Sequence, residues 1–432
     1  MGVATFVENQ IGQIQQRGHS ALASRVIWAV QVLPVCILAV PVVLLCRLIR
    51  PWFLVRWGGM VSARIGHFAG NTELYLCERD AGINRPRQHH VDLFYFGEQP
   101  PCNDQLATMW KRVLTIWPRW LLLPVRGVNY LIPGGAIHDI GDNTQADRDV
   151  LNLLDRSPPH LQFTREEEEK GAAGLRAMGI PPGATFVCLI VRDDAYLATE
   201  KPLVNWSYHD YRDSDIQNYV LAAEELATRG YVVIRMGARV RKGMKTAHER
   251  VIDYATNGMR SDFMDIYLGA KCEFCISVGT GFDAIPQIFR RPVVYVNMVP
   301  PGYFATYSRQ YVGITKHHYS VEETRELTLR EIFARGIGFF LWSDEYRKHG
   351  IRLVENSPEE IRDVVVEMVE RLNGTWQPHG GDDDLQSRFW KIFPTDAVDT
   401  YAHGRALHGE IRSRFGAAFL RNNRAFLETP IQ

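Results

Sequence analysis

The sequence has no excess of charge of either sign. Lysine and arginine total 49, aspartate and glutamate also total 49, and the formal net charge at pH 7 is +0. A nucleic-acid-binding domain normally carries a marked basic footprint. We therefore expect no nucleic acid among the partners of this chain, although local groups of arginines remain candidates for binding smaller anions.

Cysteine is scarce and unpatterned. The chain holds 7 cysteines, scattered and odd in number. This excludes the disulfide framework of a small secreted protein and favours a reducing compartment. The one C-x-x-C pair, Cys272 and Cys275, falls in an expected strand, where residues three apart face opposite sides. We interpret both as structural thiols.

Several motifs of common enzyme classes are missing. There is no G-x-x-x-x-G-K-[ST] phosphate loop, no G-x-S-x-G elbow and no His/Cys spacing that would indicate zinc. Asp382, Asp383 and Asp384 fall in a glycine-rich stretch, 377–388, which we expect to be a solvated loop. We therefore expect neither a metal nor a cofactor.

A long apolar segment is present near the start. Residues 26–46 carry no charge, and as a helix they would extend about 30 Å, the thickness of a bilayer core. The segment starts late for a signal peptide and lacks a cleavage site. Prolines within it and basic residues on both flanks leave four alternatives, namely a kinked segment that enters one leaflet and returns, a helix in the membrane plane, a single span and a buried core helix. The residues after it that suit a membrane surface are Arg47, Arg50, Trp52, Phe53, Arg56 and Trp57.

The remaining chain alternates short apolar runs with helical patterns, which predicts parallel sheets. In the first half we expect strands at 72–77, 91–96 and 128–132, with a helix that places Leu106, Met109, Trp110 and Val113 on one face. In the second half we expect strands at 186–191, 231–237, 274–277 and 292–297, and helices at 215–230, 262–270, 282–289 and 357–374.

Polar residues and glycines follow the ends of the expected strands of the second half. In open parallel sheets, ligands bind at these carboxyl ends. Arginines beside backbone N–H groups at a helix start make an anion site, suited to a phosphate or diphosphate. The candidate donor-binding residues are Arg192, Arg235, Ser277, Gly279, Thr280, Gly281, Asp283 and Asn297.

The stretch "SVGTGFDAIP" also fits the dinucleotide fingerprint G-x-G-x-x-A. That fingerprint needs an acidic residue at the end of the next strand to hold a ribose, and Asn297 stands there instead. We therefore do not expect a nicotinamide enzyme. A turn that serves only packing remains the alternative to a phosphate cradle.

Two further segments carry candidate residues. The stretch 206–215 is dense in polar and aromatic groups, and His209, Asp210 and Arg212 could bind a polyhydroxylated ligand. In the first half, Arg64, Gly66 and His67 precede an expected strand. We assign both groups to the acceptor side, and an ordinary capped loop is the alternative for the first.

Seven motifs together resemble a family of bacterial glycosyltransferases often associated with surface polysaccharide synthesis. They are "RIGHFAGNTELYL", "NDQLATMWKRVL", "VCLIVRDDAYL", "WSYHDYRDSDIQNY", "VIRMG", "ISVGTGFDAIPQIFRRPVVYVN" and "LHGEIRSRFGAAFLRNN". The similarity extends from about residue 60 to the C-terminus. The "VRDD" arginine is also similar to the arginine of an H-x-R motif in fucosyltransferase-like enzymes, but Ile190 stands at the histidine position.

The resemblance implies the GT-B fold, an α/β architecture in which two Rossmann-like domains face a cleft. We divide the chain into a membrane-associated helical segment (1–58), an acceptor-side domain (59–165), a nucleotide-sugar-binding domain (166–376) and a C-terminal helical region (377–432). We expect a metal-independent transfer of a sugar from a nucleotide sugar to a glycan or lipid-linked acceptor, at the cytoplasmic face of the inner membrane.

In this hypothesis Arg192 and Arg235 balance the leaving diphosphate, and Asp193 or His67 is the general base. Two other functions remain open. One is a nucleotide-sugar epimerase or hydrolase of the same architecture, and the other is a noncatalytic scaffold that binds a nucleotide or glycan.

Overall fold

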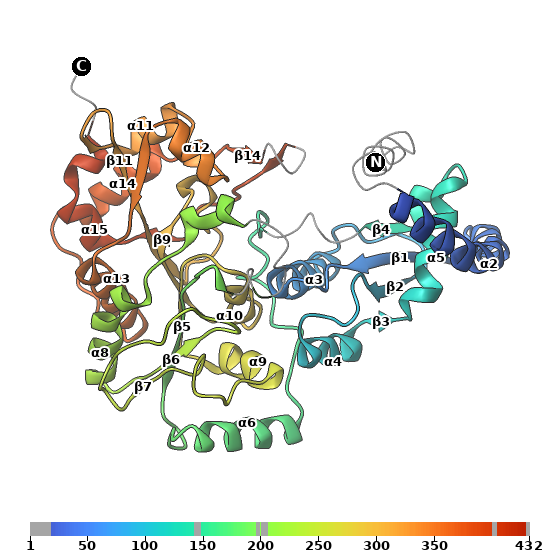
Figure 1. Ribbon diagram of the computed structural model, residues 1–432, viewed down its shortest axis with the longest axis horizontal. Coiled ribbons are helices and arrows are strands. Elements are labelled where there is room, and N and C mark those ends of the chain that lie inside the picture. Colours follow the sequence, from blue (N-terminus) through green and yellow to red (C-terminus); the bar gives the residue numbers. More distant parts are fainter. Residues whose placement is uncertain (1–18, 142–147, 196–198, 200–205, 400–403, 429–432) are drawn as a thin grey trace. The chain divides into compact units, whose positions relative to one another are not determined.

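The computed structural model describes residues 19–141, 148–195, 199, 206–399 and 404–428, with the backbone alone for 19–33. The chain divides into two compact units. Unit 1 comprises Met1–Val61, Asn84–Gln99 and Leu114–Asn143, and unit 2 comprises Ser62–Ile83, Pro100–Val113 and Thr144–Gln432. Both units are built on parallel sheets with helices packed on them (Figure 1), which confirms the predicted α/β class.

Unit 1 holds a four-stranded parallel sheet in the order β3-β2-β1-β4. Its strands are β1 (Leu54–Met60), β2 (His90–Phe96), β3 (Thr115–Ile116) and β4 (Asp139–Gly141). Helices α2 (His19–Ile49) and α5 (Arg119–Leu131) pack against each other and against β1. The predicted strand at 91–96 is confirmed, whereas the one predicted at 128–132 is wrong, because those residues lie at the end of α5.

The apolar segment 26–46 lies within α2, and Pro34 and Pro41 are inside that helix. Among the residues that the structure describes, no helix combines the length and the apolar character needed to cross a membrane. Two of the expected membrane-facing side chains are instead internal. Trp57 is buried and stacks on His138 with ring centroids 5.4 Å apart, and Arg56 forms an ion pair with Asp92 at 2.6 Å.

Unit 2 is centred on a seven-stranded sheet whose neighbouring strands are all parallel. The order across it is β16 (Arg414–Phe415), β10 (Tyr311–Thr315), β9 (Val293–Met298), β8 (Cys275–Ser277), β5 (Phe186–Ile190), β6 (Val232–Met236) and β7 (Val251–Ile252). The predicted strands of the second half are confirmed. They read as continuous apolar runs because helices cover both faces of the sheet.

The alternation along β5 shows how the two faces are filled. Val187 and Leu189 contribute to one apolar core with helices α8 (Val220–Thr228) and α13 (Pro358–Leu372). Cys188 and Ile190 contribute to a second core with α9 (Asp262–Lys271). In Figure 1 the first two helices lie on one side of β5 and β6, and α9 lies on the other.

Helix α3 (Ile65–Asp80) also belongs to unit 2, where it packs on α10 (Ala284–Ile288), and α4 (Asp104–Val113) packs on α9. The strand predicted at 72–77 is wrong, because that run lies inside α3. All of its residues are buried, and a short apolar run in a fully buried helix has no periodicity that separates it from a strand. The predicted helix with Leu106, Met109 and Trp110 on its inner face is confirmed as α4, but Val113, predicted on the same face, is exposed.

The remaining elements surround this sheet. They are α6 (Arg165–Ala177), α11 (Leu329–Ala334), α12 (Ser343–Lys348), α14 (Asp382–Ile392), α15 (Ala417–Asn422), β11 (His317–Ser320), β12 (Arg325–Glu326), β13 (Ile351–Val354), β14 (Val398–Asp399) and β15 (Arg405–Ala406).

The loop predicted at 377–388 is wrong in its second half, which forms the start of α14. Asp382 is buried there and pairs with Arg421 at 2.7 Å, so only its neighbours on the helix are solvated acids.

The division into units differs in outline from the predicted domains, since α3 and α4 come from residues that we assigned to the acceptor side and lie in unit 2. The boundaries at 58, 165 and 376 and the GT-B cleft stay predictions. For the site, the consequence is that residues from the start of α3 and from the strand ends of the large sheet can be described within one unit.

Candidate functional site

The corner after β8 is the centre of the site. Ser277 ends the strand, and its hydroxyl accepts the N–H of Gly279 at 3.0 Å and donates to Asp283 at 3.0 Å. Gly279 has φ of +75°, a left-handed conformation that a side chain strains. Thr280 then precedes the short helix η4 (Gly281–Asp283). The predicted strand-to-helix turn is therefore present, with its backbone held by Ser277.

Gly281 makes a close approach to the start of α3. A β-carbon built on Gly66 would lie 2.9 Å from the α-carbon of Gly281, and one built on Gly281 would lie 3.2 Å from the backbone nitrogen of Gly66. Two glycines are thus needed for the backbones to touch. The packing alternative that the sequence left open holds for Gly281, and this contact brings Arg64 and His67 of the α3 start to the same corner.

The segment 206–215 supplies a second arginine to the corner. It contains the helix η2 (Ser207–Arg212), and the Arg212 guanidinium donates to the carbonyl of Gly279. The segment is tied down by Lys316, whose buried ammonium donates to the carbonyls of Tyr211 and Asp213 at 3.2 and 2.6 Å. Arg212, which we predicted on the acceptor side, therefore lies on the glycine corner predicted to hold the donor.

Arg192 follows the end of β5 and lies beside the segment 206–215. Its guanidinium is mostly buried, donates to the carbonyl of His209 at 3.3 Å and lies 3.4 Å from the Asp213 carboxylate. Burial and the neighbouring Arg212 lower the pKa of Arg192. Burial also raises the pKa of Asp213 to about 6 despite the arginine. Two guanidinium groups therefore lie close enough together here for one to disfavour the charging of the other.

The same arginines also affect the pKa of His209. Its pKa is lowered to about 4, first by burial and then by Arg192, Arg212 and Arg64. The ring is neutral at pH 7 in consequence. Three arginines from three separate segments thus converge on this histidine, and a group that bears several negative charges would relieve their mutual repulsion.

Three buried polar atoms around the corner have no hydrogen-bond partner among the described residues. They are Nδ1 of His67, Nδ1 of His209 and the hydroxyl of Thr280. Leaving such atoms unpaired costs about 1–3 kcal/mol each. Their coincidence with the arginines indicates a ligand site for an anion that also offers hydrogen-bonding oxygens.

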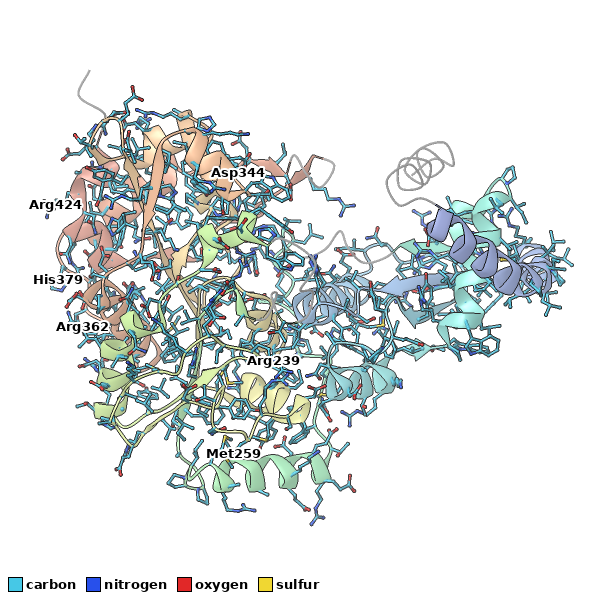
Figure 2. All side chains as sticks on the ribbon, viewed as in Figure 1. Arg239, Met259, Asp344, Arg362, His379 and Arg424 are labelled. Carbon is cyan, nitrogen blue, oxygen red and sulfur yellow. The ribbon has the colours of Figure 1, made fainter. Side chains whose placement is uncertain are left out.

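A cavity of about 480 Å³ opens between the ends of β5 and β6. It is lined by Val191, Asp193, Asp194, Asp210, Asp213, Ser214, Asp215, Ile216, Arg235, Arg241 and Lys242. Its walls carry charges of both signs. Arg239, Arg241 and Lys242 come from the segment after β6, where Figure 2 labels Arg239. Arg241 pairs with Asp194 and Lys242 pairs with Asp215.

Two of the predicted site residues line this cavity, and their side chains form hydrogen bonds with other groups of the protein. The Asp193 carboxylate accepts the backbone N–H groups of Ala195 at 3.0 Å and Arg241 at 2.8 Å. Arg235 is buried and bonds through one terminal nitrogen to Asp253 and to the carbonyl of Lys242, while its Nε has no partner among the described residues. Both side chains line the cavity, but neither guanidinium nor carboxylate is fully available to a ligand.

Asn297, at the end of β9, is bonded within the protein interior. It is fully buried, with its side-chain nitrogen donating to the Tyr219 hydroxyl at 2.9 Å and its oxygen accepting the N–H of Asn356 at 2.6 Å. It adopts a φ of +53°, for which asparagine is favoured. These bonds join β9 to the segment before α13, and the donor-binding role expected of Asn297 stays a prediction.

Aromatic rings lie next to His209. The indole of Trp342 stacks on the imidazole, with centroids 5.9 Å apart and planes inclined by 10°. Tyr208 lies 4.1 Å from His209 and 5.0 Å from Trp342, centroid to centroid. The indole is 40% exposed. The sequence pattern does not reveal this cluster, because Trp342 comes from a distant segment, and it offers a planar surface beside the arginines.

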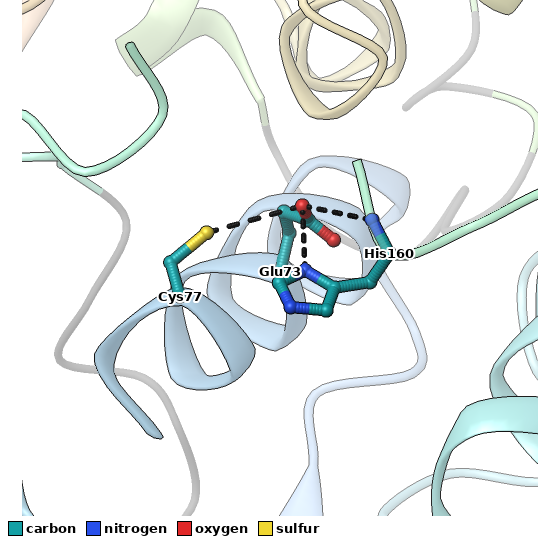
Figure 3. Close-up of side chains that lie close together, drawn as sticks. All are labelled: Glu73, Cys77 and His160. Carbon is teal, nitrogen blue, oxygen red and sulfur yellow. Dashed lines mark hydrogen bonds and ion pairs between the residues drawn. The ribbon is translucent and has the colours of Figure 1, made fainter. Parts of the chain in front are cut away.

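A separate cluster joins Glu73, Cys77 and His160, three side chains that could ligate a metal (Figure 3). The Glu73 carboxylate accepts from His160 Nδ1 at 3.0 Å and from the Arg290 guanidinium at 2.6 Å. The same guanidinium lies 3.5 Å from the Cys77 sulfur. A cationic side chain therefore already holds the position a metal would take, and we interpret the cluster as a structural charge network.

Comparisons with known proteins add little to this geometry. No model of a known protein family matches the chain, and neither does any curated protein. Among solved structures, the ADP-heptose LPS heptosyltransferase II of E. coli is 12% identical, over 60% of this chain and 90% of that one, with a TM-score of 0.35. A glycosyl transferase family 9 protein from Veillonella parvula is 10% identical, over 74% and 97%, with a TM-score of 0.41. Likenesses at such low TM-scores carry no argument about fold or function.

Proposed function

We propose that this chain transfers a sugar from a nucleotide-sugar donor to a glycan or lipid-linked acceptor. The observation that carries the proposal is the convergence of Arg64, Arg192 and Arg212 on the Gly279–Gly281 corner. Three guanidinium groups and a set of unpaired polar atoms suit the diphosphate of such a donor. The stacked rings of Trp342 and His209 suit its nucleobase or sugar.

In the reaction the bond between the anomeric carbon and the diphosphate oxygen breaks, and a bond forms from that carbon to an acceptor hydroxyl oxygen. Negative charge develops on the leaving diphosphate, and preorganised positive groups stabilise it. Arg192 and Arg212 supply that charge at the corner. We propose that these guanidinium groups make a divalent cation unnecessary, so that activity persists in a chelator.

The acceptor hydroxyl must lose a proton to a base. A base must reach the proton that it removes, and both oxygens of Asp193 are tied to backbone N–H groups of Ala195 and Arg241, which hold the carboxylate in place while leaving each oxygen a free lone pair. His67 keeps Nδ1 without a partner among the described residues and lies at the start of α3, next to the Gly66–Gly281 contact. We therefore propose His67 rather than Asp193 as the base.

We propose that Arg212, and not Arg235 as the sequence predicted, binds the donor. Arg235 is committed to Asp253, whereas Arg212 lies on the carbonyl of Gly279. Asp283 is buried beside Ser277, and burial raises its pKa to about 7. It supports the corner from within, and we assign it no contact with the donor.

We place the chain at the cytoplasmic face of the inner membrane, where a lipid-linked acceptor would be found. Exposed apolar side chains on helices α2 and α5 of unit 1 support this location. The surface polysaccharide pathway remains part of the proposal through the resemblance of the sequence motifs alone.

The test uses the purified full chain and a panel of uridine, guanosine and adenosine diphosphate sugars, screened by thermal shift. A stabilising donor is then incubated with and without membrane lipid extract, and the released nucleoside diphosphate is measured. Release that depends on the extract supports transfer. Release without any acceptor would identify an epimerase or hydrolase instead, and binding without turnover would identify a scaffold.

A further inference from the structure

Helices α2 and α5 form one layer over the sheet of unit 1. Ala39 and Val43 of α2 and Val125 and Val128 of α5 are buried together against Trp57 of β1. Residues four apart on α2 and three apart on α5 lie on one side of a helix. Each helix therefore turns one narrow side to the sheet, and their opposite sides face away from it in the same direction.

Arg47 fixes the end of α2 to the end of α5. Its guanidinium donates to the carbonyl of Asn129 at 3.0 Å, to that of Ile132 at 2.9 Å and to that of Pro133 at 2.6 Å. It also donates to the Asn129 side chain at 2.8 Å. These bonds hold the last turns of α2 against the body of unit 1, so this part of the helix cannot extend away from the unit.

The outward sides of the two helices are apolar and exposed. On α2 and the residues after it they are Ile37, Leu38, Val40, Val42, Leu44, Leu45, Leu48, Trp52 and Phe53, and on and around α5 they are Trp117, Trp120, Leu123, Tyr130, Leu131 and Ile137. Trp120 and Leu131 are 69% and 73% exposed. Scattered apolar residues are ordinary on a surface, but a contiguous face of this kind marks an interaction site.

The charged side chains of α2 and α5 are all basic, and one of them, Arg126 of α5, is paired with Asp139 of β4 at 3.0 Å. Neither residues 9–72 nor residues 105–138 contain an aspartate or glutamate. Exposed Arg50 and Arg119 lie at the end of α2 and at the start of α5. Basic side chains and tryptophans around an apolar face fit the headgroups of an anionic lipid surface. A second copy of the same positive face would repel it.

We propose that the outward sides of α2 and α5 insert together into one leaflet of an anionic bilayer, with both helices in the plane of the membrane. This deepens the proposed membrane location, from a contact made by one segment to a two-helix face in which α5 supplies Trp117 and Trp120. It rests on the proposed function only for the lipid-linked acceptor, and it can fail while nucleotide-sugar binding persists.

The experiment measures flotation of the full chain with vesicles of phosphatidylethanolamine and phosphatidylglycerol. Trp120→Asp combined with Leu131→Asp places two charges on the α5 side without touching the buried side of the helix. Val321→Asp, at an exposed apolar residue of unit 2, is the matched control. We expect the double variant to lower the bound fraction at least tenfold and the control to leave it unchanged. The circular dichroism melting temperature is measured for each variant to show that it is folded.

Two further readouts separate the alternatives. Brominated lipids should quench the wild-type tryptophan fluorescence, and replacing phosphatidylglycerol by a neutral lipid should weaken binding. Unchanged flotation of the folded double variant would overturn the proposal. So would a wild-type dimer in sedimentation that the double variant loses, because the face would then bind a second copy. Thermal shift with nucleotide sugars, done on the same preparations, reports on the proposed function separately.

Discussion

His209 is the residue at which the charge of the site can be measured. Its imidazole is neutral at pH 7 because burial and the three arginines hold its pKa at about 4. A bound diphosphate adds negative charge and raises that pKa, so the complex takes up a proton that the free protein does not. By linkage, affinity then rises as pH falls through the pKa of the complex toward about 4, the pKa in the free protein.

The prediction is that inorganic pyrophosphate binds more tightly at pH 5.5 than at pH 7.5, with proton uptake in calorimetry performed in two buffers of different ionisation enthalpy. His209→Gln should bind pyrophosphate without the protein's share of this uptake, and the difference between the two proteins removes the ligand's own titration. Equal proton uptake by both proteins would rule out the role of His209.

His160 should affect stability rather than activity. Burial opposes its charging, but hydrogen bonds with Cys77, Glu73 and Asp80 outweigh that effect and raise its pKa to about 10. A raised pKa contributes stability that is fully present below the unfolded value of about 6.5 and is lost as pH rises toward 10.

We expect His160→Gln to lower the free energy of unfolding by roughly 3 kcal/mol at pH 7, because it leaves buried Glu73 with Arg290 alone. The loss should shrink as the pH approaches 10, which urea denaturation at several pH values measures. A loss that stays constant up to pH 10 would contradict the ion-pair account.

At the scale of elements, the contact between α3 and η4 leaves no room for a side chain unless the backbone moves. Gly66→Ala puts a β-carbon 2.9 Å from the backbone of Gly281, so the two helices must separate. We expect a loss of about 1–3 kcal/mol in stability and a larger proportional loss of donor binding, since Arg64 and His67 move with α3.

Gly127→Ala is the control for that substitution. Gly127 lies in α5, and a β-carbon there meets no atom within 4 Å, so alanine should leave stability unchanged or raise it. Calorimetric melting of both variants, with and without a donor, gives the comparison. Equal melting temperatures for Gly66→Ala and the wild type would show that the close approach is not needed.

The strands of the large sheet could be predicted from the sequence, but helix α3 could not. The strands of the large sheet are predictable because parallel strands covered on both faces are continuous apolar runs between turn residues. The run 72–77 also contains several apolar residues, yet it lies in α3, where every one of its residues is buried. Composition alone cannot distinguish a strand covered on two faces from a helix enclosed on all sides.

The same limit holds within the site. Arg192, Ser277, Gly279 and Thr280 could be predicted because each follows directly from the end of a strand. The position of Arg212 and the ring of Trp342 could not, because each reaches the corner through tertiary contacts of a loop or of a helix start. Nor does the sequence show that Asn297 is buried, because the segment that bonds it, at Asn356, is distant along the chain.

At the scale of the whole molecule, unit 2 contains the anion site and unit 1 contains the apolar two-helix face. Deleting residues 1–50 would uncover Trp57, Val125 and Val128, which α2 buries. Loss of membrane binding after that deletion could therefore reflect misfolding, and surface substitutions on α5 give the clearer answer. In our proposal, the chain combines a donor site on unit 2 with a lipid-facing surface on unit 1.

The central claim is that the arginines at the glycine corner hold the diphosphate of a nucleotide sugar. The most direct measurement is calorimetric titration of the donor found by thermal shift into the wild type, Arg192→Ala, Arg212→Ala and the control Arg424→Ala, whose exposed side chain lies in unit 2 on the short helix η7 (Arg424–Leu427). Loss of one charge-assisted hydrogen bond corresponds to roughly tenfold to hundredfold weaker binding. We predict that loss for the first two variants and none for the control, and donor binding that is unchanged in Arg192→Ala and Arg212→Ala would contradict the account.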